Sequence, residues 1–352
     1  MTSTPGRIRL TDVAQHAGVS TATVSRVLNG KREVAEETRR AVLAALDMLG
    51  YERPEWLRPR TSGLVGVLVS ELSNPVFASF AQSIESSLSG AGYTPVLGTQ
   101  SPGGTTEDEF VEMLLSHNVD GIIFVSGLHA DSRAATDRYE RLRNLNVPFV
   151  LINGSDGRIE APALATDDTS SMDLAVRHLV TQGHRHIGLA LGPERFIPTQ
   201  RKRDGFIAAA RRHLQQDVPP IISTLYTVEG GQAAANSLYS AGCTAVICGS
   251  DLMALGAVRA ARARGLDVPR DVSVIGYDDS PLMPFTDPAL TTLRQPVDVM
   301  SKSAVDSLVG AITGEPVPDS ELRFVAELVV RGSTGAAPGS QPIAVDTAAT
   351  TR

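Results

Sequence analysis

The chain has little cysteine, few aromatic residues and no long hydrophobic run. Its 352 residues include two cysteines and one tryptophan, and aromatic residues make up 5%. Both cysteines, Cys243 and Cys248, lie in the apolar stretch GCTAVICGS, which favours reduced core thiols over a disulfide or a metal-binding pair. No apolar run approaches the roughly 18 residues of a membrane-spanning helix, and the N-terminus lacks the apolar core of an export signal. We therefore expect a cytoplasmic protein with no membrane partner.

The formal net charge of −7 argues against a general nucleic-acid binder, but the charge is unevenly distributed. Residues 1–60 carry ten Lys and Arg against seven Asp and Glu, whereas residues 61–352 carry 22 against 32. A slightly basic N-terminal region on an acidic remainder indicates that only this region meets a polyanion. The composition, with 42% hydrophobic and 20% charged residues, is that of a globular chain, and the length predicts two or three domains.

The first 50 residues are predicted to form three short helices, in the segments TDVAQHAG, TATVSRVLN and EETRRAVLAALDMLG. A tight turn joins the first two helices, as in a helix-turn-helix that presents its second helix to the major groove of DNA. Gly18 suits the left-handed turn, and Ser20 suits the N-cap of the second helix. Val24, Val27 and Leu28 are predicted to face inward. On this pattern alone, a helical hairpin without a partner is the alternative.

From Leu64 onward, short apolar strands alternate with amphipathic helical segments. Strands are predicted at LVGVLV, YTPVLG, GIIFVS, VPFVLI, HIGLAL, IISTLY, TAVICG and VSVIGY. Such strands, nearly continuous in apolar residues and separated by helices, indicate parallel sheets covered on both faces. About 270 residues of this pattern exceed one doubly wound core, so we expect two α/β lobes. The segment from Ser333 is small, polar and without periodicity, and we expect it to be disordered.

The segment LTDVAQHAGVSTATVSRVLNG, followed by VAEETRRAVLAALDMLGY, resembles the DNA-binding domain of the lactose-repressor (LacI/GalR) family of bacterial transcription regulators. Further segments that resemble this family are SNPVF, VDGIIFV, HLVTQGHRHIGLALG, SDLMALGAVRAARARGLDVPRDVSVIGYDD and LTTLRQP. The resemblance implies a homodimer that binds double-stranded, pseudo-palindromic operator DNA. It also implies a core similar to periplasmic sugar-binding proteins, with two lobes, three crossover strands and a ligand cleft between the lobes.

The expected domain limits follow from this resemblance. A helix-turn-helix DNA-binding domain spans residues 1–50, and a hinge linker spans 51–62. The two-lobe effector-binding and dimerisation core spans 63–332, and a disordered tail spans 333–352. Within the core, the expected segments are 63–164 and 291–322 for the first lobe, and 165–290 and 323–332 for the second. The fold class is an all-α head joined to a periplasmic-binding-protein-like α/β core with parallel sheets.

The resemblance also implies DNA contacts on the second helix. Thr21 and Ala22 stand where the family reads base edges. Arg26 stands where an arginine contacts guanine, whose O6 and N7 match the two N–H groups of a guanidinium. Phosphate contacts, which fix the register on DNA without reading sequence, are implied for Ser20, Thr23, Ser25 and Asn29.

The linker carries a second candidate for DNA contact. Pro54 and Pro59 leave space for at most about one helical turn between them, and such a turn is unstable alone. Its apolar residues Trp56 and Leu57 are therefore candidates for insertion into the minor groove when DNA binds. Permanent packing of Trp56 against the protein is the alternative.

Polar and aromatic residues follow many of the predicted core strands, where open α/β sheets bind their ligands. Carboxylates, amides, cations and aromatic faces together suit a hydroxylated ring, so we expect a sugar or sugar derivative as the effector. The strand ends and the positions that the resemblance implies give the candidate effector-binding residues Asn74, Phe77, Asn153, Arg195, Lys202, Tyr226, Ser250, Asp278 and Gln295. In the run RKR, Arg201 and Arg203 are the alternatives to Lys202.

Several polar residues have a structural alternative. Asn74 and Asp251 are also placed to cap helices. Asp167 and Asp168 are expected as turn and helix-start carboxylates rather than as ligand contacts. The three histidines of HLVTQGHRH are expected to make structural hydrogen bonds rather than to bind a metal or take part in catalysis.

No catalytic motif competes with this interpretation. The sequence has no His, Cys, Asp or Glu set with metal-ligand spacing, no GxSxG elbow, and no GxGxxG or GxxxxGK[ST] loop. A solute-binding receptor of a transport system fits the core but not the helix-turn-helix. We therefore expect a dimeric transcription regulator, specifically a repressor, that is not an enzyme and needs no cofactor or metal. A small effector between the lobes is expected to change its affinity for DNA.

Overall fold

The computed structural model describes residues 9–28, 34–49, 63–100 and 103–339. The chain divides into two compact units, Met1–Ser62 and Gly63–Arg352, which we call the head and the core and describe separately. The predicted hinge linker, 51–62, lies outside the described residues.

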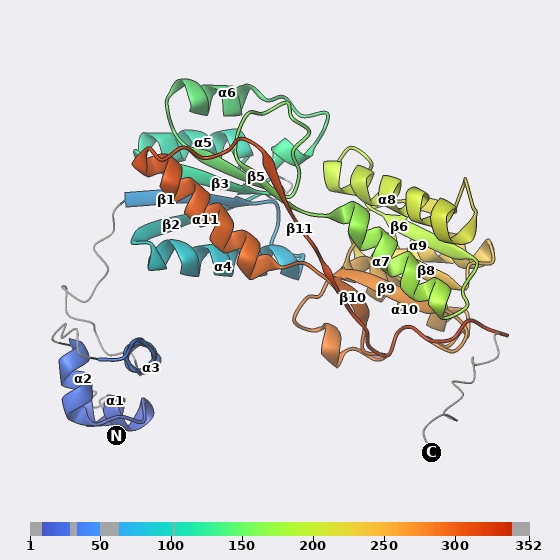
Figure 1. Cartoon of the computed structure of the whole chain (residues 1–352), viewed down its shortest axis with the longest axis horizontal. Helices are drawn as coiled ribbons and strands as arrows, with labels where there is room; N and C mark the ends of the chain where they lie inside the picture. Colours follow the sequence, from blue (N-terminus) through green and yellow to red (C-terminus); the bar gives the residue numbers. More distant parts are fainter. Residues whose placement is uncertain (1–8, 29–33, 50–62, 101–102, 340–352) are drawn as a thin grey trace, which may run out of the picture. The chain divides into compact units, whose positions relative to one another are not determined.

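The head contains the three predicted helices, α1 (Leu10–His16), α2 (Thr21–Leu28) and α3 (Glu36–Met48) (Figure 1). Val24, Val27 and Leu28 of α2 are buried in one apolar cluster with residues of α1 and α3. Gly18 takes a left-handed φ of 64° between α1 and α2. The Ser20 Oγ accepts a hydrogen bond from the Thr23 N–H at 3.1 Å, which caps α2. The predicted helix-turn-helix is confirmed.

The core contains two six-stranded sheets, and the first has the strand order β11-β5-β4-β3-β1-β2. Every pairing in it is parallel. Its strands are β1 (Gly63–Val69), β2 (Tyr93–Thr99), β3 (Gly121–Val125), β4 (Phe149–Ile152), β5 (Ala163–Thr166) and β11 (Glu321–Phe324). One face packs against α4 (Pro75–Gly90) and α11 (Val297–Thr313), and the other against α5 (Glu107–Ser116) and α6 (Asp137–Asn144) (Figure 1). This sheet and its helices form the first lobe.

The second sheet has the strand order β12-β10-β9-β8-β6-β7, and only its β10–β12 pairing is antiparallel. Its strands are β6 (Ile187–Leu191), β7 (Ile221–Ser223), β8 (Ala245–Cys248), β9 (Ser273–Asp278), β10 (Thr291–Arg294) and β12 (Glu327–Val329). Helices α7 (Asp168–Thr181) and α8 (Ile197–Leu214) cover one face, and α9 (Val228–Ser240) and α10 (Asp251–Ala263) the other. Cys243 and Cys248 are free and buried in this second lobe, as predicted. The core also has short 3-10 helices at Leu128–Ala130 and Met283–Phe285.

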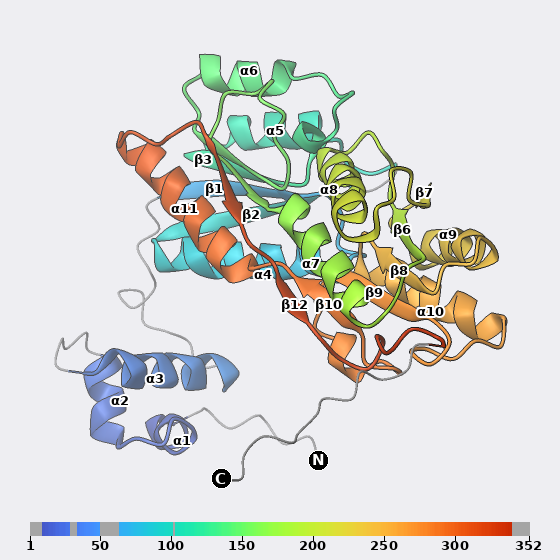
Figure 2. The same ribbon diagram turned by 45° about the vertical axis from the view of Figure 1, so that its right-hand side comes forward.

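The chain passes between the two sheets three times: after β5 toward α7, after β10 toward α11, and from β11 to β12 (Figure 2). The predicted lobe limits are wrong in three places. Residues 165–166 end β5 and residues 323–324 end β11, so both belong to the first lobe and not to the second. Conversely, residues 291–294 were assigned to the first lobe. They form β10, which pairs with β9 in the second sheet, so the crossover lies after Arg294. Strands β5, β10, β11 and β12 have only three or four residues each. The equally short β4, β7 and β8 each contain two Val or Ile residues and were predicted, whereas these four contain at most one, and the strand prediction missed all four.

The beginning of the predicted disordered tail is packed against the second lobe. Ser333 is buried, and its Oγ accepts a hydrogen bond from the Thr291 N–H at 2.8 Å and donates one to the Val274 carbonyl at 2.6 Å. The Gly335 carbonyl lies 3.1 Å from His184 Nε2, and the Ala337 N–H donates to the Gln182 carbonyl at 2.8 Å. Residues 333–339 are therefore part of the fold, because their backbone groups have partners that composition does not reveal. Residues 340–352 lie outside the described part of the chain.

A buried histidine couples the stability of the first lobe to pH. His129 lies fully inside the protein, and its Nε2 is 3.0 Å from the Ile152 carbonyl oxygen. Burial disfavours the charged ring and lowers the pKa of His129 from 6.5 to about 4. Below pH 6.5 the unfolded chain therefore binds more protons than the folded protein, and stability is lost as the pH falls from 6.5 toward about 4.

We predict that the melting temperature falls when the pH is lowered from about 7.5 to about 5, and that His129→Gln reduces this fall. Glutamine can still donate to the Ile152 carbonyl but does not titrate. His178 and His184 also have pKa values lowered by burial, so part of the fall should remain. Thermal denaturation at several pH values measures the effect, and an equally steep fall in the variant would contradict it.

Candidate DNA-binding helix and effector site

The predicted DNA-reading residues occupy the outer face of α2. Thr21, Ala22 and Arg26 are exposed, whereas Thr23 and Ser25 are half-buried. This division follows from the helical period, since positions 24, 27 and 28 are the buried ones. Ser20 is exposed but its hydroxyl is used by the cap, and it also lies 2.9 Å from Thr23 Oγ1. Three further predicted DNA contacts, Asn29, Trp56 and Leu57, lie outside the described residues.

In the core, five of the nine predicted effector residues belong to one buried polar cluster, which we call the cleft cluster: Asn74, Lys202, Tyr226, Asp278 and Gln295. Asn74 follows β1 of the first lobe, and Asp278 ends β9 of the second. The Gln295 Nε2 donates to Asp278 Oδ1 at 2.7 Å, and the Gln295 Oε1 accepts from Thr166 Oγ1 at 2.8 Å. Gln295 therefore connects the end of β9 in the second sheet to the end of β5 in the first.

Asp278 is the carboxylate on which the cleft cluster converges. Burial raises the pKa of Asp278 well above its ordinary value, and the charge of Asp251 raises it further. Hydrogen bonds from Gln295 and Asn74 and the ammonium of Lys202 act in the opposite direction. The Asn74 Oδ1 also accepts from the Val76 N–H at 3.4 Å and so caps α4. Asn74 can thus cap α4 and form a hydrogen bond with Asp278 at the same time.

Lys202 is buried and forms an ion pair with Asp168, with 2.7 Å between Nζ and Oδ1. Its Nζ lies 4.0 Å from the centroid of the Tyr277 ring, and the Tyr277 hydroxyl donates to Asp168 Oδ1 at 2.7 Å. Burial opposes the ammonium charge, but the attraction of Asp168 and Tyr226 outweighs it, and the pKa of Lys202 is raised. Of the three residues in RKR, only Lys202 joins the cleft cluster.

The two sequence neighbours of Lys202, Arg201 and Arg203, do not join the cleft cluster. Arg201 contacts the first lobe, donating to Glu321 at 2.7 Å and to the Ser155 carbonyl at 2.5 Å. Arg203 pairs with Asp204 at the surface. Successive helical residues are about 100° apart, so one lysine turns inward while its two neighbours do not.

Tyr226 provides the aromatic side chain of the cleft cluster. Its hydroxyl lies 2.7 Å from Thr199 Oγ1, and its ring occupies the space that a Cβ atom would need at Gly192, after β6. Gly249, after β8, lies against the other side of the ring. The two glycines are therefore required for this tyrosine to lie across the ends of β6 and β8.

Four predicted effector residues are not connected to the cleft cluster by any described contact. Ser250 is buried, and its Oγ accepts from the Met253 N–H at 3.3 Å as the N-cap of α10. Phe77 packs against the core of the first lobe. Asn153 takes a left-handed φ of 64° after β4. Arg195 forms an ion pair with Asp131, with 3.0 Å between Nε and Oδ2.

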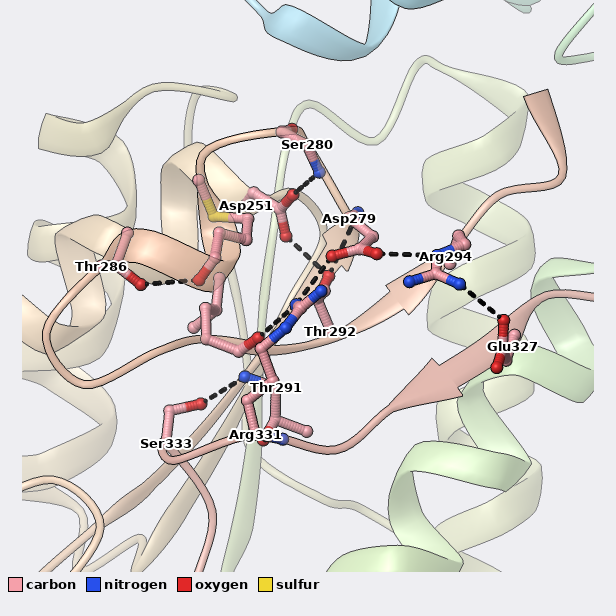
Figure 3. Close-up of polar contacts among 12 residues, drawn as sticks. Asp251, Asp279, Ser280, Thr286, Thr291, Thr292, Arg294, Glu327, Arg331 and Ser333 are labelled. Atoms are coloured by element: carbon pink, nitrogen blue, oxygen red, sulfur yellow. Dashed lines mark hydrogen bonds and ion pairs between the residues drawn. The ribbon is translucent and has the colours of Figure 1, made fainter. Parts of the chain in front are cut away.

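Sequence reasoning did not identify the residues that hold the turn after β9. Asp278 and Asp279 have φ values of 116° and 56°, which are unusual for residues other than glycine. Asp279 is held by Arg294 and Arg331, each with an N–O distance of 2.7 Å (Figure 3). These ion pairs stabilise a strained turn and fix the direction of Asp278.

Asp251, which was expected to cap a helix, instead lies in the first turn of α10. Its carboxylate accepts from the Ser280 N–H and from Thr292 Oγ1, both at 2.6 Å (Figure 3). Burial raises the pKa of Asp251 to about 6. Asp167 accepts from the Ser170 N–H at 3.2 Å and caps α7, as expected. Asp168 does more than was expected, because it is the counter-ion of Lys202.

Two of the three histidines, His178 and His184, make the structural hydrogen bonds that were predicted, whereas His186 is exposed. His184 is buried between Thr244 Oγ1, at 2.9 Å, and Ser273 Oγ, at 3.0 Å. His178 Nε2 lies 3.0 Å from Thr334 Oγ1. Across the described residues, no group of three or more His, Cys, Asp or Glu side chains is arranged to hold a metal ion. In the same part of the chain, no helix is both long and apolar enough to cross a membrane.

The head has three helices, and the outer face of the second is exposed. The core has two lobes with polar residues at the ends of their strands. Together these features define a regulator that binds DNA through one unit and carries a ligand-binding fold in the other. The comparisons agree. Residues 9–54 match bacterial regulatory proteins of the lacI family, and residues 176–334 match the periplasmic binding protein-like domain. The chain belongs to the lacI family: it is a DNA-binding transcriptional regulator and not an enzyme.

Individual relatives are similar over nearly the whole chain. The HTH-type transcriptional regulator reg1 of Streptomyces lividans is 58% identical over 339 residues, which cover 95% of this chain and 98% of that protein. The transcriptional regulator CelR in complex with cellobiose is 31% identical, with a TM-score of 0.69 and coverage of 93% and 100%. The Lac repressor dimer bound to operator and the anti-inducer ONPF is 30% identical, with a TM-score of 0.69 and coverage of 94% and 100%.

We predict that Lys202→Met lowers the free energy of unfolding by about 3–5 kcal/mol, because Asp168 is left as a buried charge without its counter-ion. Adding Asp168→Asn should recover part of the loss, since no uncompensated charge remains. Chemical denaturation measures these differences.

The matched control is Lys302→Met. Lys302 pairs with Asp306 one turn along α11 at the same 2.7 Å, but both side chains are exposed. Its loss should stay below about 1 kcal/mol. Equal losses at the two lysines would show that burial does not determine the strength of the Lys202 pair.

Proposed function

We propose that the protein is a homodimeric transcriptional repressor whose affinity for operator DNA is set by a small carbohydrate bound between the two lobes of the core. The cleft cluster carries this proposal, because it places a carboxylate, two amides, an ammonium and a phenol at the strand ends where the lobes meet. Such groups offer paired donors and acceptors to the hydroxyls of a sugar ring, and Tyr226 offers an aromatic face. In one similar protein, CelR, the bound ligand is cellobiose.

For the head, the outward positions of α2 support a role in reading operator DNA. Thr21, Ala22 and Arg26 are exposed, and a helix of this size fits the major groove. We assign base contacts to these three residues, and contacts to the DNA backbone to Ser20, Thr23, Ser25 and Asn29. Trp56 and Leu57 remain our candidates for insertion into the minor groove. Operator DNA also implies that the protein works in the cytoplasm.

Exposed apolar side chains support a dimer. Leu225, Leu282 and Phe285 of the second lobe are 62%, 66% and 84% exposed, and Leu97 on the edge strand β2 is 50% exposed. Contiguous apolar surface is typical of protein–protein interfaces, and the proposed dimer would bury side chains of this kind. A twofold axis would present two heads to the half-sites of a palindromic operator. The Lac repressor, to which this chain is similar, binds its operator as a dimer.

Arg26→Ala should weaken binding to the operator by about 1–3 kcal/mol, whereas binding to random DNA should weaken much less. The reason is that a guanidinium reads guanine through two hydrogen bonds that random sites do not offer. Gel-shift titrations on the DNA upstream of the protein's own gene and on a scrambled duplex measure both affinities.

Arg26→Lys is the matched variant, because it keeps the charge and loses the two-pronged geometry. It should retain binding to random DNA and still lose discrimination. Equal losses on the operator and on random DNA would contradict base reading by Arg26.

Asp278→Asn should remove the response to effector and leave DNA binding unchanged. Asparagine keeps the size of the side chain and tolerates a positive φ, but its amide is a poorer acceptor for sugar hydroxyls and for Gln295. A thermal-shift screen of mono- and disaccharides, nucleosides and nucleobases identifies the ligand, and gel shifts with and without it measure the response. A wild-type effector titration in a correctly melting variant would contradict this role.

A further inference from the structure

Two loops from different lobes of the core meet through polar contacts. The first follows β3 and carries Asp131 and Ser132. The second follows β6 and carries Arg195, and Gln200 lies just beyond it at the start of α8. The Arg195 Nε lies 3.0 Å from Asp131 Oδ2. The N–H and the Oγ of Ser132 both donate to the Arg195 carbonyl, at 2.9 and 2.8 Å, and the Gln200 Nε2 donates to Ser132 Oγ at 3.2 Å. We call these four residues the latch.

Residues of the first lobe hold the loop that carries Asp131 and Ser132. The buried Glu107 carboxylate accepts from the Leu128 N–H at 2.9 Å and from Gln100 Nε2 at 2.6 Å, which holds the loop after β3 against α5. The Arg158 Nη2 donates to the Asp131 carbonyl at 3.0 Å. Asp131 is therefore held in place by its own lobe before it meets Arg195.

The second-lobe side is ordered in the same way. The guanidinium of Arg195 lies 4.8 Å from the centroid of the neighbouring Phe196 ring. Phe196 also forms an isolated antiparallel bridge with Asp131, which is a further contact between the lobes. The Gln200 Nε2 also donates to the Glu194 carbonyl at 2.8 Å, at the start of α8. Both halves of the latch are thus built by their own lobes, and only the contacts between them join the lobes.

None of the latch residues belongs to the three segments by which the chain crosses between the sheets. The contacts Asp131–Arg195, Ser132–Arg195 and Ser132–Gln200 can therefore break when the lobes separate, without unfolding either sheet. The contact between Thr166 and Gln295 differs, because both residues lie next to crossover segments. Together with the contacts of Arg201 to Glu321 and to the Ser155 carbonyl, the latch therefore reports on whether the lobes are closed.

We propose that the latch sets the equilibrium between closed and open lobes, and that it thereby determines how tightly the effector is held; this rests on the proposed effector site between the lobes. Arg195 then acts as a positioning residue rather than as a ligand contact. If the effector needs the closed form, its apparent dissociation constant rises in inverse proportion to the closed fraction. Asp131 is nearly buried, with 12% of its side chain exposed, whereas 50% of the Arg195 side chain is exposed, so the ion pair is partly shielded from water and salt.

The experiment measures lobe separation directly. Cysteines introduced at the exposed positions Asn144 in α6 and Ala208 in α8 carry spin labels, while the native Cys243 and Cys248 are buried. Asp131→Ala should shift the label-to-label distance distribution toward longer distances. Exchanging the charges, Asp131→Arg with Arg195→Asp, should restore much of the short-distance population. Ser132→Ala, which removes only the hydroxyl contacts, should give a smaller shift in the same direction.

The matched control is the pair Arg143–Glu160, at 2.6 Å, which lies within the first lobe. Arg143→Ala should leave the distance distribution unchanged. Distributions that are identical in wild type, Asp131→Ala and Ser132→Ala would overturn the latch. An equal shift in Arg143→Ala would overturn it as well, because any lost ion pair would then loosen the core.

A ligand titration separates the latch from the proposed function. With cellobiose as the probe, Asp131→Ala should raise the dissociation constant about tenfold, which is the expected loss for a hydrogen-bonded charge pair. The change should come mainly from faster dissociation. Absence of cellobiose binding in the wild type would count against this disaccharide as the effector, while the label distances would still decide whether the latch exists.

Discussion

The arrangement of the core depends on the pairing of buried charged side chains at the ends of its strands. Lys202 is buried between Asp168 and the ring of Tyr277, and Asp278 is buried within reach of the same ammonium. A buried charge without a partner costs several kcal/mol, so these groups fix one another. Gln295 extends the arrangement to Thr166 and hence to the first lobe. The position of one lobe relative to the other thus depends on a polar cluster that a ligand with hydroxyl groups can enter or rearrange.

A fold with two separately packed lobes suits a regulator, because the lobes can change their relative position without unfolding. Each lobe has its own sheet and its own apolar clusters, so neither needs the other to bury its core. The lobes are joined by three crossing segments and by polar side chains. Polar contacts between rigid bodies are individually modest and exchange readily with water or ligand hydroxyls. The coupling that we propose between effector binding and DNA binding requires that small changes in these contacts select between arrangements of the lobes.

The sequence predicted the parts that depend on neighbouring residues. The helix-turn-helix was predicted completely, since its turn, its cap and its buried positions all lie within residues 10–28. The strands of the core with longer apolar runs were predicted, and short strands such as β10 were not, because β10 is stabilised by pairing with β9 rather than by its own pattern. Five of nine effector candidates converged in the cleft cluster. Ser250 did not, because its hydroxyl caps α10.

By itself, the sequence determined the class of the protein, the head, the alternation of strands and helices, and the strand ends at which polar residues gather. These features are set by periods and motifs that act over a few residues. Only the tertiary structure decided which charges meet: that Lys202 turns inward and Arg201 does not, that Asp168 is a counter-ion, and that Arg195 joins Asp131 across the lobes. Such pairs link residues distant in sequence, and their energies depend on burial and distance, which no local pattern of residues contains.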